Sequence, residues 1–481
     1  MSQLAKLSLI KIRDLLQTKE VSVQEVLTAC LDQIQTTEPQ IAALLYQHTE
    51  KAKTQAQCLD AQGPNPQKPL WGVPITIADN INTADIPTTS GSKMLETFVP
   101  LQDAHCVAKL KNAGAIILGK TNVDELGLGA STENSAFAIS KNPWNPAHVP
   151  GGSCGGSAAS VASGQCFASI GIDTTGSLRQ PASFCGLVGF KASYGRVSRH
   201  GLMACASSLD QAGPMTRTVA DTALILEVMA GHDPQDTTSC QTSVPNFIHG
   251  LNENSLQGLR LGLPAEYWQD LSSEVDMVCR KVLDLAQSLG AELVPLSLPH
   301  TPYVDAVATI LTAAEASSNL ARLDGVRYGY RYQQTQDLND LYTYSRSKGL
   351  GMEVMRTVLL GTHVLSSTNY EPYYNQAARI RRLIQQDFIH AWTSCDLICA
   401  PTCPTTAPLL HASNKPHQAI GLTAAVNLAG LPGLTLPVGL GEESTLPIGL
   451  QLMGPYLEEG IVLRTAATLE QHLPSLQFPF A

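Results

Sequence analysis

The chain has 481 residues, of which 44% are hydrophobic and 15% are charged. This composition is typical of a folded protein with a large core and excludes a disordered chain, which needs many charges and few apolar residues. The 31 Lys and Arg residues against 41 Asp and Glu give a formal net charge of −10, so the body as a whole does not bind the phosphate backbone of nucleic acids.

The first clear element is a helix that begins near residue 22. Ser22-Val-Gln-Glu25 is typical of a capping box, in which the serine and the glutamate each bind a free backbone N–H group. Apolar residues then recur at helical spacing up to Ile34. Further along, the polar segment 55–68 contains Gly63, Pro64 and Pro66 and predicts a surface connection.

Short apolar runs, several of them rich in Val and Ile and bounded by Gly or Pro, alternate with helical or glycine-rich stretches through the rest of the chain. They predict buried strands at 73–77, 115–118, 166–172, 259–263, 293–296, 397–400, 434–438 and 447–453. This alternation predicts an α/β fold with a mixed or mostly parallel sheet. The polar stretch 233–254 predicts a loop, with a soft boundary inside one domain as the alternative. The chain has no run of 18 apolar residues, and its twelve cysteines form no Cys-x-x-Cys pair, so we expect no membrane span and a reduced, cytoplasmic protein.

Two segments in the first half are candidates for function. Residues 149–163 are unusually rich in glycine and serine, and 157–162 predict a helix of small residues buried against a sheet. Ser177 stands in a turn just beyond an apolar strand, where a hydroxyl can face a cleft and backbone N–H groups can form an oxyanion hole. From composition alone an ordinary turn is the other interpretation. A phosphate-binding loop is a third, although the segment lacks the Gly-Lys-Ser/Thr ending.

Longer motifs resemble one family. They include Gly151-Gly-Ser-Cys-Gly-Gly-Ser-Ala158, Asp173-Thr-Thr-Gly-Ser-Leu-Arg-Gln-Pro-Ala182 and Phe184-Cys-Gly-Leu-Val-Gly-Phe-Lys191. These segments are similar to the signature of the amidase-signature hydrolases. Tyr194-Gly-Arg-Val-Ser-Arg-His-Gly-Leu202 and Leu360-Gly-Thr-His-Val-Leu-Ser-Ser367 resemble, within this family, the A subunits of aspartyl/glutamyl-tRNA(Asn/Gln) amidotransferases. The resemblance is strongest over about 71–242.

The resemblance implies the family's fold and a Ser–Ser–Lys triad. The fold is a central mixed β-sheet covered by helices on both faces, here as one domain over 1–481 with a helical N-terminal segment at about 5–60. The attacking serine corresponds to Ser177, and the relay serine, preceded by a cis peptide bond, corresponds to Ser153. The lysine belongs in a segment that reads here Gly72-Val-Pro-Ile-Thr-Ile-Ala-Asp-Asn80, where its position is occupied by Ala78.

This departure predicts lost chemistry, because a serine hydroxyl is a poor nucleophile unless a base takes its proton. Removing a positioned base typically lowers the rate about 10²–10⁴-fold. Lys120 is a possible substitute, but the family pattern already carries a lysine there, which favours a structural role.

Other family positions around the pocket are also changed. The oxyanion hole falls on Thr174, Thr175 and Gly176, where Thr175 replaces a family glycine. If that glycine needs a positive φ or lies close to the substrate, threonine is unfavourable there. The family has a pair of arginines, one of which holds the substrate carboxylate, where this chain has Arg356 and Thr357. A family aspartate falls on Ile420, and a family tyrosine falls near Ala308 and Thr309.

The resemblance therefore predicts a homologue of the glutaminase A subunit with glutamine hydrolysis lost or nearly lost. Two alternatives stay open: an active A subunit that supplies ammonia to Glu-tRNA(Gln) or Asp-tRNA(Asn), and a stand-alone amidase or binding protein with a remodelled pocket. The partners implied are B and C subunits, with tRNA bound only through the B subunit. We expect no metal and no cofactor on this chain, since ATP and magnesium would belong to the B subunit.

Overall fold

One large sheet runs through the molecule. The computed structural model describes residues 3–412 and 419–479, and the side chains of all of these except 419 and 420. Its 11 strands lie in the order β1-β3-β2-β4-β6-β5-β10-β11-β9-β7-β8. Their bounds are β1 Leu44–Gln47, β2 Pro74–Ala78, β3 Ile116–Thr121, β4 Ala168–Asp173, β5 Val188–Lys191, β6 Gln211–Thr216, β7 Arg260–Pro264, β8 Glu292–Leu296, β9 Leu397–Pro401, β10 Gly433–Leu440 and β11 Pro447–Met453.

The sheet is mixed rather than mostly parallel. Parallel pairs join β2 to β3 and β4, and β7 to β8 and β9. The other neighbours are antiparallel. Each predicted apolar run coincides with a strand to within about three residues, but β1, β5 and β6 were not predicted. In β6 a Gly213-Pro214 pair interrupts the expected pattern, although both residues are buried in the sheet.

Helices cover the sheet on both faces, as the resemblance implies. Their bounds are α1 Leu9–Gln17, α2 Val23–Ile41, α3 Thr49–Gln62, α4 His105–Asn112, α5 Gly155–Ala162, α6 Arg179–Cys185, α7 Val219–Met229, α8 Ser273–Ser288, α9 Val304–Asn319, α10 Leu338–Gly349, α11 Met352–Val364, α12 Gln376–Ala391, α13 Ala419–Ala429 and α14 Glu459–His472. A Cβ added at Gly189 in β5 would meet Ala182 of α6, whereas Thr216 of the neighbouring strand β6 bonds Thr222 of α7. Helices α6 and α7 therefore lie on opposite faces.

The N-terminal segment confirms one local prediction and corrects another. Ser22 and Glu25 form both contacts of the capping box at the start of α2. The predicted surface connection at 55–68 is wrong over its first half, because α3 continues to Gln62 and ends at Gly63 with a φ of 77°. Ala56 and Leu59 are buried on one face of α3. Tertiary packing therefore stabilises a helix that could not be predicted from the polar composition of this segment.

The predicted helix of small residues is α5, and every residue of it is buried. Close approach explains the composition. A Cβ at Gly156 would lie 2.5 Å from the carbonyl oxygen of Asn122, which is closer than a side-chain carbon can come. The helix thus packs tightly under the strand ends that carry the candidate site.

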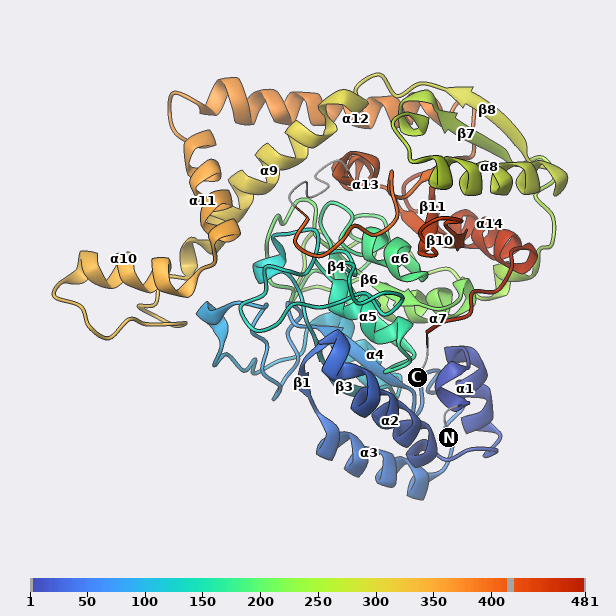
Figure 1. The fold of residues 1–481 in the computed structure, drawn as a ribbon, viewed down its shortest axis with the longest axis horizontal. Helices are drawn as coiled ribbons and strands as arrows, with labels where there is room; N and C mark the ends of the chain where they lie inside the picture. Colours follow the sequence, from blue (N-terminus) through green and yellow to red (C-terminus); the bar gives the residue numbers. More distant parts are fainter. Residues whose placement is uncertain (1–2, 413–418, 480–481) are drawn as a thin grey trace.

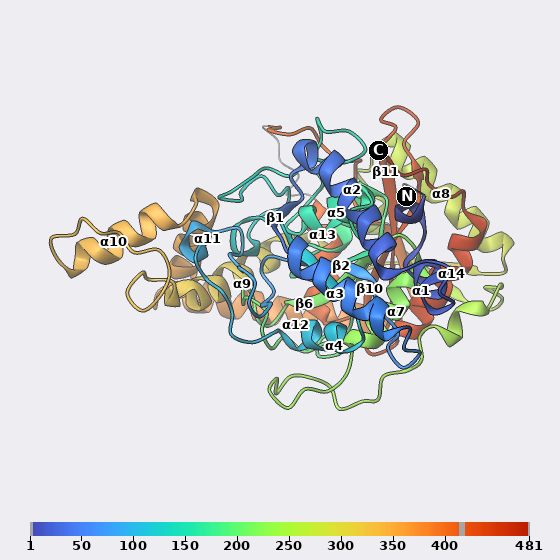
Figure 2. The same cartoon turned by 90° about the horizontal axis from the view of Figure 1, so that it is seen from below.

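Helices α9, α11 and α12 form a rim beside the sheet, and α10 projects away from the body in both views (Figure 1, Figure 2). The predicted loop at 233–254 contains one short 3-10 helix, His249–Asn252, and is otherwise irregular. Within the described ranges, no helix combines the length and apolar character that crossing a membrane requires.

Candidate functional site

A cavity of about 150 Å³ lies beyond the carboxyl end of β4, beside Ser177. Loops near the strand ends form one side of it, and helices α9 and α11 form the other. It is lined by Gly127, Leu128, Gly129, Ala130, Gly152, Thr174, Thr175, Gly176, Ser177, Gln180, Cys205, Ala308, Thr309, Thr312, Ala313, Glu353, Arg356, Thr357, Leu360 and Thr423. Six predicted site residues therefore meet here, namely Thr174, Thr175, Gly176, Ser177, Ala308 and Thr357. The side chain of Ile420 lies outside the described residues.

The turn before Ser177 is held by the carboxylate of Asp173. Its Oδ1 accepts from the N–H of Gly176 at 2.8 Å and its Oδ2 accepts from the N–H of Leu178 at 3.2 Å. Arg179 donates to both oxygens, at 3.0 and 3.1 Å. Burial acts to raise the pKa of Asp173, but the charge of Arg179 outweighs it and holds this pKa below its usual range. The amide of Gly176 is thus already engaged, which leaves Thr174 and Thr175 of the predicted oxyanion set.

The residue of this turn that needs a positive φ is Gly176, and Thr175 does not need one. Gly176 has a φ of 126°, whereas Thr175 is not in the left-handed region. The hydroxyl of Thr423 donates to the carbonyl of Thr175 at 2.6 Å and fills the space above Gly176. Threonine at 175 therefore causes no backbone strain, and its side chain simply narrows the cavity.

Ser153 lies directly beside this cavity. The peptide bond from Gly152 to Ser153 is cis, as the resemblance implies. Gly152 lines the cavity, and its N–H donates to the side chain of Gln180 at 3.0 Å. A Cβ added at Gly127, another lining residue, would lie 3.9 Å from Oγ of Ser153. Both predicted serines are buried, at 2% and 5% exposure for Ser153 and Ser177.

Ala78 is the last residue of β2 and is fully buried. It is in register with Thr121 of β3, whose hydroxyl bonds Ser157 of α5 at 2.6 Å. Two residues earlier, Thr76 bonds Ser160 of the same helix at 3.2 Å. Because alternate residues of a strand share a face, Ala78 faces α5, the helix that begins two residues after Ser153.

Lys120 points to the opposite face of the sheet. It is in register with Ile77, one residue before Ala78, and its ammonium donates to the carbonyl of Ile81 and to the hydroxyls of Thr83 and Thr88, the latter two at 3.1 Å. Burial lowers its pKa to about 8. Of the described residues, the other buried lysine is Lys191, which donates to a backbone carbonyl at 2.8 Å, and no lysine donates to Ser153.

The side of the cavity formed by α9 and α11 carries one close charge pair. Arg356 and Glu353 lie one turn apart on α11, with Nε and Oε2 separated by 3.1 Å. Thr357, at the family arginine position, donates its hydroxyl to the carbonyl of Glu353 at 3.0 Å. Ala308 on α9 contributes only a methyl group. Neither Glu353 nor Thr312 was singled out from the sequence, since nothing in their local pattern separates them from ordinary helix residues.

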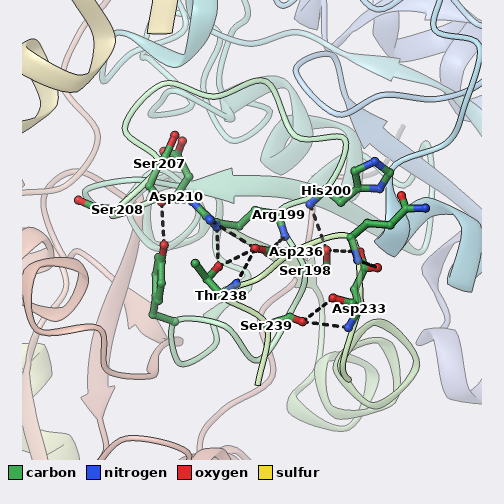
Figure 3. A network of polar contacts seen from close by, with 12 residues as sticks. Ser198, Arg199, His200, Ser207, Ser208, Asp210, Asp233, Asp236, Thr238 and Ser239 are labelled. Carbon is green, nitrogen blue, oxygen red and sulfur yellow. Dashed lines mark hydrogen bonds and ion pairs between the residues drawn. The ribbon is translucent and has the colours of Figure 1, made fainter. Parts of the chain in front are cut away.

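A polar network lies behind the turn. The buried carboxylate of Asp210 accepts from the hydroxyl of Thr174 at 2.8 Å, and burial raises its pKa to about 7. Close by, Arg199 bonds Asp236 and Thr238 (Figure 3). The motif at 194–202 therefore serves to tie the loop at 233–254 to the body. Among the described residues, no three His, Cys, Asp or Glu side chains are arranged to hold a metal ion.

Comparison with known proteins places these features in a family. The family model described as amidase matches residues 25–463. The chain belongs to the amidase family. Structures of other members share its fold: a peptide amidase from Stenotrophomonas maltophilia has a TM-score of 0.85 and 28% identity, with 100% of this chain and 99% of that one covered.

Relatives of higher identity carry one name. The A subunit of glutamyl-tRNA(Gln) amidotransferase from Solidesulfovibrio magneticus is 53% identical over 487 residues, with 100% of both chains covered. The protein of the same name from Nitratidesulfovibrio vulgaris is 54% identical over 485 residues, with 100% of this chain and 99% of that one covered. The crystal structure of the A subunit from Thermotoga maritima has a TM-score of 0.82 and 34% identity, covering 99% of this chain and 97% of that one. The chain is therefore a homologue of these A subunits over its whole length.

Proposed function

We propose that this chain is an A-subunit homologue of the tRNA-dependent amidotransferase that is deficient in glutamine hydrolysis. The observation that carries the proposal is the methyl group of Ala78 on the sheet face that packs against α5, the helix that begins two residues after Ser153. In the family that the sequence resembles, a lysine at this position receives a proton. The hydroxyl of Ser177 loses this proton when it attacks the amide carbon. A methyl group accepts no proton, so the hydroxyl of Ser177 stays a weak nucleophile.

The surroundings support the same conclusion. Lys120 cannot reach across the sheet, because its three acceptors lie on the other face. Thr357 offers a hydroxyl where the family has the second arginine of a pair, and this hydroxyl is bonded within its own helix. The remaining arginine, Arg356, is paired with Glu353. The position of the proton acceptor, on the sheet face that packs against α5, and one position in the cavity wall are therefore both changed.

The proposal assigns the chain a place in an assembly. Its similarity to A subunits runs over its whole length. The proposal therefore includes that the chain keeps the surfaces that bind B and C subunits. Contact with tRNA, ATP and magnesium would occur on the B subunit. The twelve cysteines are all unpaired, which supports a reducing, cytoplasmic setting.

A glutaminase assay tests the loss of activity. We expect no ammonia release from glutamine by the purified chain, alone or combined with B and C subunits. Steady release that Ser177→Ala abolishes, but that the control Ser288→Ala on the exposed side of α8 leaves intact, would show an active A subunit instead.

Restoring the amine tests the cause. In the Thr357→Arg background, which supplies a cation for the substrate carboxylate, Ala78→Lys is expected to raise glutamine turnover about 10²–10⁴-fold over Thr357→Arg alone. Ala78→Met introduces a side chain of similar length without an amine and is expected to leave turnover unchanged. An equal response of the two variants would contradict the role given to position 78.

A stand-alone binding protein is the second candidate function. What supports it is a pocket that differs from the family pattern: Arg356 is paired with Glu353, and Thr357 stands beside it in the lining. Co-purification of the tagged chain with B and C subunits separates the two functions. Recovery of the chain without either subunit would favour the stand-alone protein.

A further inference from the structure

A lobe that contains helix α10 projects away from the body (Figure 1, Figure 2). This α10 lobe, residues 322–349, contains five of the thirteen tyrosines of the chain, namely Tyr328, Tyr330, Tyr332, Tyr342 and Tyr344. It also contains five Arg and Lys residues against three Asp residues, which gives a formal charge of +2 within a chain of −10. The lobe therefore differs from the acidic body both in charge and in aromatic content.

Three cations of the α10 lobe are free to bind a ligand. The side chains of Arg327, Arg331 and Lys348 are exposed and form no hydrogen bond or ion pair with the described residues. The three acids of the lobe do not pair with them and instead accept from backbone N–H groups of the lobe itself. A guanidinium without a partner is well suited to bind a phosphate oxygen.

Three tyrosines of the lobe have exposed rings. Tyr328, Tyr342 and Tyr344 are 45%, 39% and 40% exposed. The ring of Tyr344 also contacts that of Tyr332, with centroids 5.3 Å apart. Aromatic rings are the surfaces on which the bases of single-stranded nucleic acids stack. The lobe thus combines rings that can stack with bases and cations that can bind phosphates.

Contacts with the body hold this surface in place. The N–H of Tyr330 donates to the carbonyl of Met94 at 2.8 Å, and Nζ of Lys93 lies 4.4 Å from the centroid of the Tyr330 ring. Arg346 of α10 donates to the carbonyl of Leu320, at the end of α9, at 3.3 Å. Because these contacts already fix the backbone, binding a ligand requires less additional ordering.

The composition of the surface favours a nucleic acid over a protein partner. Tyrosine and arginine are also frequent in protein–protein interfaces, where they surround an apolar centre. The α10 lobe, which the structure describes throughout, exposes Leu338 as its one large aliphatic side chain. Its other exposed residues are largely polar and include Gln333, Gln334 and Gln336, whose amides can bond to the edges of unpaired bases.

We propose that the α10 lobe binds single-stranded RNA, through phosphate contacts from Arg327 and Arg331 and base stacking on Tyr328. The inference goes beyond the proposed function and rests on it in one respect, because the tRNA held by the B subunit is the RNA that the assembly supplies. This contact is additional to that of the B subunit, and it does not depend on whether glutamine is hydrolysed.

Fluorescence anisotropy of a labelled oligouridine RNA of about twelve nucleotides tests the contact on the full chain. We expect binding with a Kd of about 10⁻⁴–10⁻⁶ M. Phosphate contacts from Arg327, Arg331 and Lys348 predict that the logarithm of the binding constant falls with the logarithm of the salt concentration with a slope of about −2. Arg327→Ala combined with Arg331→Ala is expected to weaken binding at least about tenfold and to bring the slope to about −0.7.

Two controls match these variants. Lys11→Ala combined with Lys51→Ala removes the same charge from exposed sites on α1 and α3 and should leave the affinity and the slope nearly unchanged. Tyr328→Leu keeps an apolar side chain but removes the ring, and it is expected to weaken binding about fivefold or more. Tyr303→Leu alters a ring that is 52% exposed outside the lobe and should not weaken binding.

Absence of RNA binding at low salt overturns the inference. An equal loss of affinity in the two double variants also overturns it, since it would assign the binding to net charge alone. Capture of the B and C subunits is measured with the same variants, and loss of a subunit with RNA binding intact would assign the lobe to a protein partner instead. The ammonia assay is independent: release from glutamine contradicts the proposed function, whereas a chain that binds no oligouridine contradicts only this inference.

Discussion

Gly176 is the position at which the turn carrying Ser177 is most sensitive to a small change. Its φ of 126° belongs to a region that side chains rarely adopt, and forcing alanine there is unfavourable by about 1–3 kcal/mol. The new Cβ would also lie 2.1 Å from Oγ1 and 2.7 Å from Cβ of Thr423. Relieving such overpacking typically costs about 1–3 kcal/mol. Together these effects predict that Gly176→Ala lowers the free energy of unfolding by about 2–6 kcal/mol.

Gly460 provides the matched control. It lies in the first turn of α14, no atom lies within 4 Å of a Cβ added there, and its φ is not positive. Gly460→Ala should therefore stabilise the chain by about 0.5–1 kcal/mol. Urea unfolding followed by circular dichroism measures both variants. A Gly176→Ala chain within about 1 kcal/mol of the unaltered one would refute the argument, because it would mean that the turn and Thr423 can move apart freely.

Three further changes probe the buried charges. Arg179→Met leaves the carboxylate of Asp173 buried without its cation, so we expect a loss of about 3–5 kcal/mol in urea unfolding; a loss below about 1 kcal/mol would show that Asp173 does not depend on this partner. The raised pKa of Asp210, about 7 against an unfolded value of 3.8, means that the native state holds a proton that the unfolded state has released. The contribution of this group to stability therefore falls by about 4 kcal/mol as pH rises from about 4 to 7, and Asp210→Asn should remove that slope; identical slopes in the two proteins would contradict it. Lys120 has its pKa lowered from 10.5 to about 8, so its contribution rises by about 3 kcal/mol between about pH 8 and 10.5. Lys120→Met should remove this rise in alkaline unfolding curves, and a rise that persists in the variant would assign it to other groups.

The sequence by itself determined most of the elements that local patterns control. The capping box at Ser22 and the small residues of α5 each carry a short-range signal, and both elements form as predicted. Where tertiary contacts outweigh local preference, prediction failed. Helix α3 continues through a polar stretch because Ala56 and Leu59 pack against the body, and β6 tolerates Gly213-Pro214 because its neighbours hold it in the sheet.

The sequence alone was also enough to identify the candidate residues of the site. The motif around Ser177 and the alanine at position 78 can both be read from the chain alone, because a motif keeps its spacing whatever surrounds it. Only the tertiary structure decided which face of the sheet each strand residue occupies. Register places Lys120 and Ala78 on opposite faces, so the lysine cannot take over the missing role.

The same distinction applies to the cavity. Thr175 was suspected of backbone strain, yet the positive φ belongs to Gly176. The pairing of Glu353 with Arg356 is local to α11, but the place of this pair in the cavity wall and the unpartnered hydroxyl of Thr312 depend on how α9 and α11 meet the strand ends. Residues brought together from distant parts of the chain share no local pattern, and their charges and hydrogen bonds are settled only when the elements pack.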